Sequence, residues 1–142
     1  GILSDKASKF KDALEFYGKN LGLTFQIADD ALDYNSELKL FGKNIGNDFF
    51  EGKITLPIIL LYQKISDLDK VKLKKFFYKE ERGNDDLNYV LDLIKRNNII
   101  KDCYKKADHF INLASNSLSV FKESEEKIIL QKLTSFSIER DF

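Results

Sequence analysis

Residues 22–34 read GLTFQIADDALDY, and this stretch is the most informative part of the sequence for the fold. It continues a stripe of apolar residues that recurs at spacings of three and four along residues 10–32. The stripe consists of Phe10, Leu14, Tyr17, Leu21, Phe25, Ala28 and Leu32. Because this period matches one face of a helix, it predicts a long amphipathic helix. We expect the helix to begin near Ser4 or Asp5, both good N-caps, and to fade after Tyr34.

A second stripe with different chemistry runs along the same predicted helix. Its members are Gly18, Gly22, Gln26, Asp29 and Asp33. Glycine inside a helix costs about 1 kcal/mol relative to alanine. Two glycines on one stripe therefore predict that something packs closely beside them, and a neighbouring helix is favoured over a ligand.

Composition narrows the class of protein. The chain has 142 residues and a formal net charge of zero, which predicts one domain over 1–142 and argues against a nucleic-acid binder. A single cysteine, Cys103, cannot form an internal disulfide, so a reducing cytoplasm is expected. No apolar run approaches the roughly 18 residues of a membrane span.

The remaining segments predict an all-α fold. Residues 35–53 hold three glycines and no sustained period, which is typical of a loop. Thr55 is expected to cap the next helix with Pro57 in its first turn. A further helix is expected to follow Asp67 or Asp69. The expected helices after the loop cover about 57–65, 68–79, 85–96 and 98–119, with a last one from Ser124.

The acidic end of the first helix predicts a metal site. Asp29 and Asp33 are four residues apart, so both carboxylates project from one face, where they repel each other. Mg²⁺ resolves this repulsion, since it prefers oxygen ligands and accepts one or two protein carboxylates together with phosphate and water. Asp30 is turned away and is a supporting or alternative ligand. The competing interpretation is a solvated acidic patch.

The following loop adds cations to this pattern. Lys43 and Lys53 each follow a glycine, in GKN and EGK, and Asp48 lies between them in GND. Lysine is a compact cation suited to phosphate. The combination favours a diphosphate held by Mg²⁺ on one side and by ammonium groups on the other. A nucleotide P-loop is excluded because the chain has no G-x-x-x-x-G-K-[ST].

Taken in order, GLTFQIADDALDY, FGKNIGND and EGKITLP resemble the second aspartate-rich region of the trans-prenyltransferases, the polyprenyl diphosphate synthases. The resemblance is closest to the long-chain octaprenyl type. It implies the C-terminal half of an all-α isoprenoid-synthase helical bundle. The first aspartate-rich motif of the family does not occur in this sequence. Together with a start at Gly1 and the lack of methionine, this predicts a piece of a longer protein.

The resemblance implies a reaction and a set of metal ligands. Such enzymes condense isopentenyl diphosphate with an allylic diphosphate to make a long polyprenyl diphosphate, a quinone side-chain precursor, with Mg²⁺ as cofactor. By resemblance, Asp29 and Asp33 ligate Mg²⁺ on the allylic diphosphate and Asp30 supports them. Asp48 acts on the metal through water.

The resemblance also implies substrate contacts. Lys43 and Lys53 bind the allylic diphosphate. Gln26 hydrogen-bonds near the reacting centre, and Phe25 either faces the isopentenyl group or fills the core. Expected partners are the two diphosphates, the missing N-terminal half and, as a homodimer, a second copy.

Two hypotheses about the chain itself stay open at this point. The first is a part of a polyprenyl synthase that is inactive alone, because half of the metal site is missing. The second is a non-catalytic subunit or structural remnant that pairs with another helical chain. Terpene cyclases share the helical fold, but the motif set fits chain elongation better. His109 and Cys103 are expected to be passive.

Overall fold

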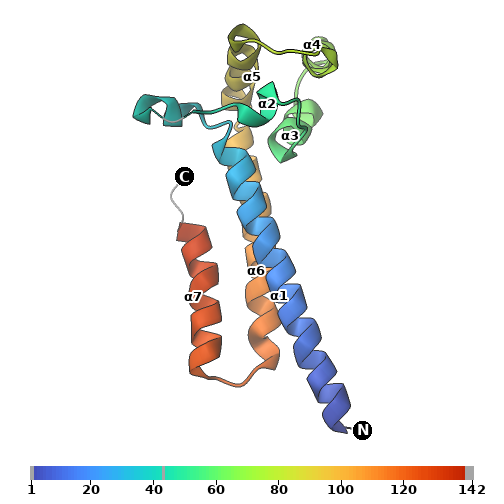
Figure 1. The fold of residues 1–142 in the computed structure, drawn as a ribbon, viewed down its shortest axis with the longest axis vertical. Coiled ribbons are helices and arrows are strands. Elements are labelled where there is room, and N and C mark those ends of the chain that lie inside the picture. The colour runs from blue at the N-terminus through green and yellow to red at the C-terminus, as the bar shows by residue number, and fades with distance from the viewer. Residues whose placement is uncertain (1, 43, 140–142) are drawn as a thin grey trace. The chain divides into compact units, whose positions relative to one another are not determined.

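The computed structural model describes residues 2–42 and 44–139, and neither range contains a strand. The all-α prediction is confirmed. The helices in chain order are α1 (Ile2–Leu32), η1 (Ser36–Phe41), α2 (Asn47–Phe50), α3 (Leu56–Lys64), α4 (Asp67–Tyr78), α5 (Asn84–Arg96), α6 (Ile99–Ser117), η2 (Leu118–Val120) and α7 (Glu125–Glu139). Figure 1 shows them in this order.

Two helix starts differ from the predicted ones, and a third agrees in position. Helix α1 is already helical at Ile2, so Ser4 and Asp5 lie inside it and do not cap it. The cap of α4 is Ser66, whose hydroxyl accepts the backbone N–H of Asp69 at 3.3 Å. Thr55 does occupy the N-cap position of α3, but its hydroxyl is buried and makes no hydrogen bond within the described residues.

The predicted loop over 35–53 contains two short helices. Asn35 starts η1, because its side chain accepts the backbone N–H of Glu37 at 3.2 Å. Helix α2 forms where Phe49 enters the core with no exposed surface. The loop prediction is wrong in these two places, since local glycine content gave no sign that a phenylalanine is buried there.

The chain divides into two compact units. One comprises the described parts of 1–26 and 106–142, and the other comprises 27–105. Helices α1 and α6 contribute residues to both. The single-domain assignment over 1–142 stays a prediction.

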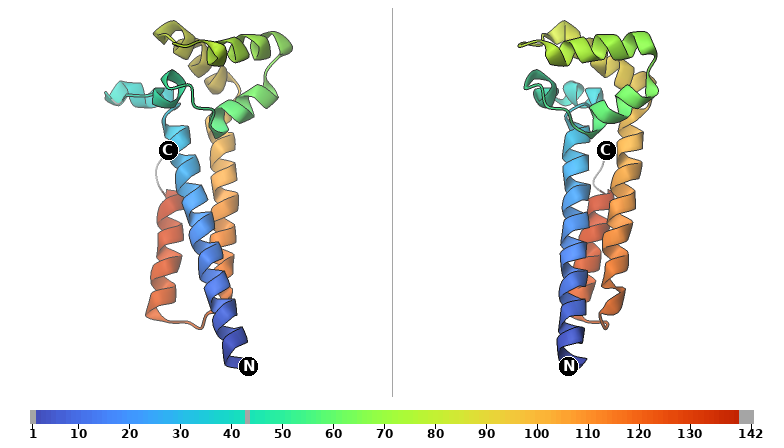
Figure 2. Two further views of the ribbon diagram at one scale, coloured as in Figure 1. Left: turned by 45° about the vertical axis from the view of Figure 1, so that its right-hand side comes forward. Right: turned by 90° about the vertical axis from the view of Figure 1, so that its right-hand side faces the viewer.

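In the first unit, segments of α1, α6 and α7 run side by side (Figures 1 and 2). One buried cluster of this unit consists of Tyr17, Ala114 and Leu118. The Tyr17 hydroxyl also donates to the Leu130 carbonyl at 2.7 Å, which ties α1 to α7. This unit leaves large apolar side chains exposed on α1 and α7, namely Leu14, Phe16, Leu23, Ile128, Ile129 and Leu133.

The second unit holds α2, α3, α4 and α5, with α3 packed against α5. Phe49 lies at the centre of an aromatic group. Its ring centroid is 6.1 Å from that of Phe76 and 5.5 Å from that of Phe77, both in edge-to-face geometry. This packing draws α2 onto α4 and thereby fixes the segment that carries Asp48 and Lys53.

Among the described residues, no helix is both long enough and apolar enough to cross a membrane.

Candidate diphosphate and metal site

The acidic residues of the predicted site lie around the C-terminal end of α1. Asp29 is exposed and Asp30 is half-buried, both within the helix. Asp33 follows the last helical residue, and its backbone N–H still donates to the Asp29 carbonyl at 3.3 Å. The helical turn therefore continues far enough to keep all three residues at one end of α1.

Asp33 also connects α1 to α2. Its carboxylate accepts the backbone N–H groups of Asn47 at 3.1 Å and Asp48 at 2.8 Å. Its own carbonyl accepts the N–H of Gly46 at 2.7 Å. Carboxylates that accept backbone N–H groups make strong, charge-assisted hydrogen bonds. Asp33 thus positions the segment after Gly46, a role that the sequence did not suggest.

This connection brings Asp48 close to the carboxylates of α1. Partial burial, followed by the negative charges of Asp33 and Asp30, raises the pKa of Asp48 above its usual value. Lys53 acts in the opposite direction but with a smaller effect. The part of this effect that comes from Asp33 and Asp30 is repulsion between carboxylates, which a divalent cation would relieve.

Lys53 is exposed at the edge of this acidic group. Its ammonium lies 3.1 Å from a carboxylate oxygen of Glu51, and its backbone N–H donates to the Asp48 carbonyl at 2.9 Å. The Glu51 hydrogen bond and charge, and then Asp48, raise the pKa of Lys53. Lys53 therefore stays charged at neutral pH. Lys43, the other predicted cation, lies outside the described residues.

Tyr34 lies beneath the acidic group. It is 1% exposed, and its hydroxyl makes no hydrogen bond to any described residue. Burial, then the charges of Asp33 and Asp48, raise the pKa of Tyr34 well above its ordinary value. The hydroxyl stays neutral, so the negative charge of this region belongs to the aspartates.

Arg82 is a positioning residue that sequence reasoning missed. Its Nε donates to the Phe49 carbonyl at 2.7 Å, and its Nη2 donates to the Phe50 carbonyl at 3.4 Å. Its Nη1 donates to the carbonyls of Phe76 at 3.0 Å and Lys79 at 2.8 Å. One guanidinium thus links the end of α2 to the end of α4. In the sequence Arg82 lies in the turn ERGND, which carries no chemical signal.

Two glycines allow this close packing. Gly46 has a φ of +83°, and a Cβ there would lie 2.5 Å from a methyl group of Leu87. Gly52 has a φ of +74°, and a Cβ there would lie 2.8 Å from Arg82 Nη2. Both positions need glycine for conformation and for space. These two requirements give a structural reason for the glycines on either side of Asp48.

Other predicted residues have simpler surroundings. Gln26 is exposed and Phe25 is half-buried, and both belong to the unit that contains residues up to 26. Their roles toward substrate stay predictions. A Cβ on Gly18 or Gly22 would meet no described atom within 4 Å, so no described residue packs closely there and the expected close neighbour stays a prediction.

Cys103 and His109 carry no sign of chemistry. Burial raises the pKa of Cys103 to about 12, so its thiol stays protonated. His109 is exposed beside Phe110.

A metal ion fits this site only if water and substrate phosphate supply part of its coordination shell. Within the described residues, no group of three or more histidine, cysteine or acidic side chains is arranged so that it could hold a metal ion by itself. The observed arrangement is a cluster of carboxylates with a raised pKa on Asp48. This fits Mg²⁺, which commonly takes one or two carboxylates and completes its shell with water and substrate phosphate.

Comparison with known proteins identifies the family. The model of the family described as Polyprenyl synthetase matches residues 1–94. The chain belongs to the polyprenyl synthetase family. A prenyl transferase of Synechocystis sp. is 34% identical over 140 residues, which are 99% of this chain and 42% of that protein.

Solved structures of polyprenyl synthetases have the same fold. A polyprenyl synthase from Caulobacter crescentus, complexed with calcium and isoprenyl diphosphate, superposes with a TM-score of 0.82 at 31% identity over 95% of this chain and 41% of that one. The octaprenyl pyrophosphate synthase of Helicobacter pylori gives 0.76 at 32% identity over 91% of this chain and 40% of that one. The chain thus spans about two fifths of these relatives.

Proposed function

We propose that this chain supplies one part of a prenyl transfer site, the part that binds a diphosphate through Mg²⁺. The observation that carries the proposal is the link made by Asp33. Its hydrogen bonds to the N–H groups of Asn47 and Asp48 bring a carboxylate-bearing helix end together with a segment that bears Asp48 and Lys53. The family membership and the calcium and isoprenyl diphosphate of the Caulobacter complex support the choice of ligand.

In this proposal Asp29 and Asp30 would ligate Mg²⁺ directly, and Asp48 would act on it through a metal-bound water molecule. Asp33 orients Asp48. Lys53 contacts the diphosphate directly. Mg²⁺ supplies Lewis-acid stabilisation of the charge that develops on a departing diphosphate. Lys53 adds a positive charge at the same place. The hydrogen bonds of Arg82 to Phe49 and Phe50 hold the segment that carries Lys53.

The reaction that we propose is the condensation of isopentenyl diphosphate with an allylic diphosphate. The allylic carbon–oxygen bond breaks and the diphosphate keeps the electron pair. The isopentenyl double bond then forms the new carbon–carbon bond, and a proton leaves. Because the chain spans about two fifths of its relatives, we expect it to be inactive alone and to need a further helical part that carries the remaining ligands.

The exposed apolar side chains of the first unit support the proposal that a further helical part packs against this chain. Leu14 and Phe16 on α1 are each 46% exposed, and Ile129 on α7 is 58% exposed. Leu14 belongs to an apolar stripe whose neighbours Tyr17 and Ala28 are buried. The same surface also fits the second candidate function, a non-catalytic chain that pairs with another helical protein.

Calorimetric titration of inorganic diphosphate into this chain tests the site. We expect binding with Mg²⁺ and much weaker binding with EDTA. The double variant Asp29→Asn with Asp30→Asn should lose the Mg²⁺-dependent part. Asp92→Asn is the matched control, since Asp92 is an exposed helix carboxylate that pairs only with Arg96 in the described contacts. Binding that ignores both Mg²⁺ and the double variant would contradict the proposed site.

Incorporation of radiolabelled isopentenyl diphosphate with farnesyl diphosphate and Mg²⁺ tests the reaction. The chain alone should give no butanol-extractable product. Product should form when the remaining part of a relative is added, and it should disappear again with the Asp29→Asn and Asp30→Asn variant. Diphosphate binding without rescue under any pairing would favour the non-catalytic alternative.

A further inference from the structure

Helix α4 has an unusual solvent side. Leu73 and Phe76 face the core, as expected for a helix with one buried face. On the other side Leu68 is 84% exposed, Val71 is 53% exposed and Tyr78 is 85% exposed. Their spacings of three and seven place these three side chains on one face of the helix. Lys75, also exposed, lies between Val71 and Tyr78 on this face.

We call Leu68, Val71, Lys75 and Tyr78 the α4 crest. Lysines lie along both of its flanks. Lys70 and Lys74 lie on the side toward α3, where each ammonium is 5.4 Å from the centroid of the Tyr62 ring.

Lys72 and Lys79 lie on the opposite flank of the crest. The Lys72 Nζ lies 3.9 Å from the centroid of the Tyr89 ring, and the Lys79 Nζ lies 3.2 Å from Asp86 Oδ2. Acidic residues of α4 occur in its first turn, where Asp69 accepts the Tyr89 hydroxyl and Asp67 is exposed. Between that first turn and the exposed Glu80 and Glu81 that follow the helix, the crest is flanked by lysines on both sides.

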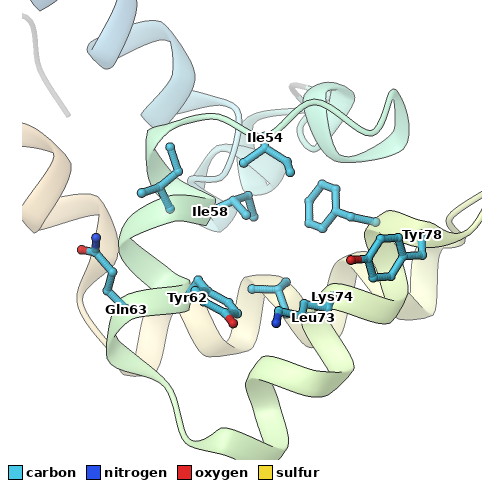
Figure 3. A pocket seen from close by; sticks show the side chains of 9 residues that line it. Ile54, Ile58, Tyr62, Gln63, Leu73, Lys74 and Tyr78 are labelled. Carbon is cyan, nitrogen blue, oxygen red and sulfur yellow. The ribbon is translucent and has the colours of Figure 1, made fainter.

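A cavity beside the crest adds an independent observation. It has a volume of about 380 Å³, within the usual range of ligand pockets, and lies between α3 and α4. Its lining is almost wholly apolar, from Ile54, Ile58, Ile59, Leu73 and Phe77, with Tyr62, Gln63, Lys74 and Tyr78 at its wall. Figure 3 shows the apolar side chains of Ile54 and Ile58 facing Tyr78 across this space. Tyr78 thus belongs both to the crest and to the cavity.

We propose that α4 docks this chain on the surface of an anionic lipid bilayer. The crest enters the boundary between headgroups and acyl chains, and the flanking lysines reach lipid phosphates. The cavity receives one acyl chain, because its apolar lining and its lysine at the wall match an apolar tail below an anionic headgroup. This inference does not rest on the proposed function.

Co-sedimentation with vesicles tests the docking. We expect the chain to bind vesicles of phosphatidylcholine with phosphatidylglycerol, to ignore pure phosphatidylcholine, and to bind less as salt rises. The variant Lys74→Gln with Lys75→Gln should weaken binding about thirtyfold, from about 1 kcal/mol for each lysine. Its control is Lys101→Gln with Lys105→Gln, which removes the same charge from exposed positions of α6.

A second pair of variants tests the crest. Leu68→Ser with Val71→Ser should weaken binding at least tenfold, since both side chains would lose the apolar boundary region. The control, Ile128→Ser with Ile129→Ser, removes exposed apolar side chains from α7. All four variants change exposed residues, so circular dichroism should report the same helix content. If each control weakens binding as much as its partner variant, the docking surface is not α4.

A nitroxide-labelled acyl chain tests the cavity. With labelled phosphatidylglycerol in the vesicles, the methyl signals of Ile58 should broaden more than those of Ile111, which is buried in the other unit. Equal broadening would remove the acyl chain from the proposal. No binding to anionic vesicles would overturn the docking as a whole and would favour a protein partner for this surface. Diphosphate binding at the other site would be unaffected in either case.

Discussion

The C-terminal end of α1 and residues 46–53 carry charges for the same proposed site, but different forces hold them. Asp29 and Asp30 keep their places because they belong to a helix of 31 residues. Asp48 belongs to a helix of 4 residues, which is too short to be stable by itself. The shorter segment therefore depends on contacts that are distant in sequence.

Three such contacts hold residues 46–53. The carboxylate of Asp33 binds the N-terminal N–H groups of α2, and the guanidinium of Arg82 binds carbonyls at its end. Phe49 fills the aromatic group between them. Of the proposed ligands, Asp29 and Asp30 are therefore positioned by the helix alone. Asp48 and Lys53 are positioned by residues that would touch no ligand. Four substitutions test this difference, and Arg82→Ala should have the greatest effect.

Arg82→Ala should lower the free energy of unfolding by about 3 kcal/mol, because several carbonyls lose a charged donor at once. Urea denaturation followed by circular dichroism measures the loss. Arg82→Lys should recover only part of it, since lysine lacks the planar fork. Arg96→Ala is the control, because Arg96 makes an exposed pair with Asp92 at 2.8 Å and should cost under about 0.5 kcal/mol. Similar losses at both arginines would mean that Arg82 does not hold the segment.

Gly46→Ala should cost about 2 kcal/mol, from a positive φ and from contact with the Leu87 methyl groups. Gly42 offers a matched control, with a φ of +73° and no described atom within 4 Å of its Cβ position. Gly42→Ala should therefore cost about 1 kcal/mol, the conformational part alone. The difference between the two variants in thermal unfolding measures the packing of Gly46 against α5, and no difference would exclude that packing.

Asp33→Asn should cost about 1 kcal/mol, since the amide can accept one backbone N–H but loses the charge-assisted bonds. Asp29→Asn should stay within about 0.5 kcal/mol, as is usual for an exposed helix position. For diphosphate binding with Mg²⁺, Asp29→Asn should have the larger effect of the two, because Asp29 is a proposed ligand. Unfolding and calorimetric titration of both variants compare the two roles. Equal losses of stability in the two variants would mean that Asp33 does not hold residues 46–53 in place.

Asp48→Asn should have the smallest effect, and with the opposite sign. A raised carboxyl pKa means that the folded chain favours the protonated form. Its stabilising contribution is present below the usual pKa of 3.8 and is lost as pH rises through the raised value. At pH 7 without divalent cation, the variant should therefore melt slightly higher than the parent chain.

The advantage of Asp48→Asn should vanish as the pH falls toward the usual carboxyl pKa, where Asp48 of the parent chain is protonated as well. Mg²⁺ should raise the melting temperature of the parent chain more than that of the variant. Melting curves across this pH range, with and without Mg²⁺, measure both effects. A parent chain that melts higher than the variant at pH 7 without metal would show that Asp48 is not strained by its neighbours.

The long first helix, the later helices and the grouping of Asp29, Asp30 and Asp33 were all predictable from the sequence. This was possible because the period of an apolar stripe and the spacing of carboxylates are local quantities, set by 3.6 residues per turn. The three-part motif also indicated the family, which the match over residues 1–94 confirms.

The way in which residues 46–53 are held became visible in the folded chain alone. Nothing local shows that Phe49 is buried, that Asp33 caps α2, or that Arg82 reaches Phe49 from 33 residues away. Gly18 and Gly22 illustrate the reverse case, in which a helical spacing suggested close packing that the described atoms do not provide. Hydrogen bonds and packing between residues that are distant in sequence depend on the tertiary fold, and no local sequence pattern specifies them.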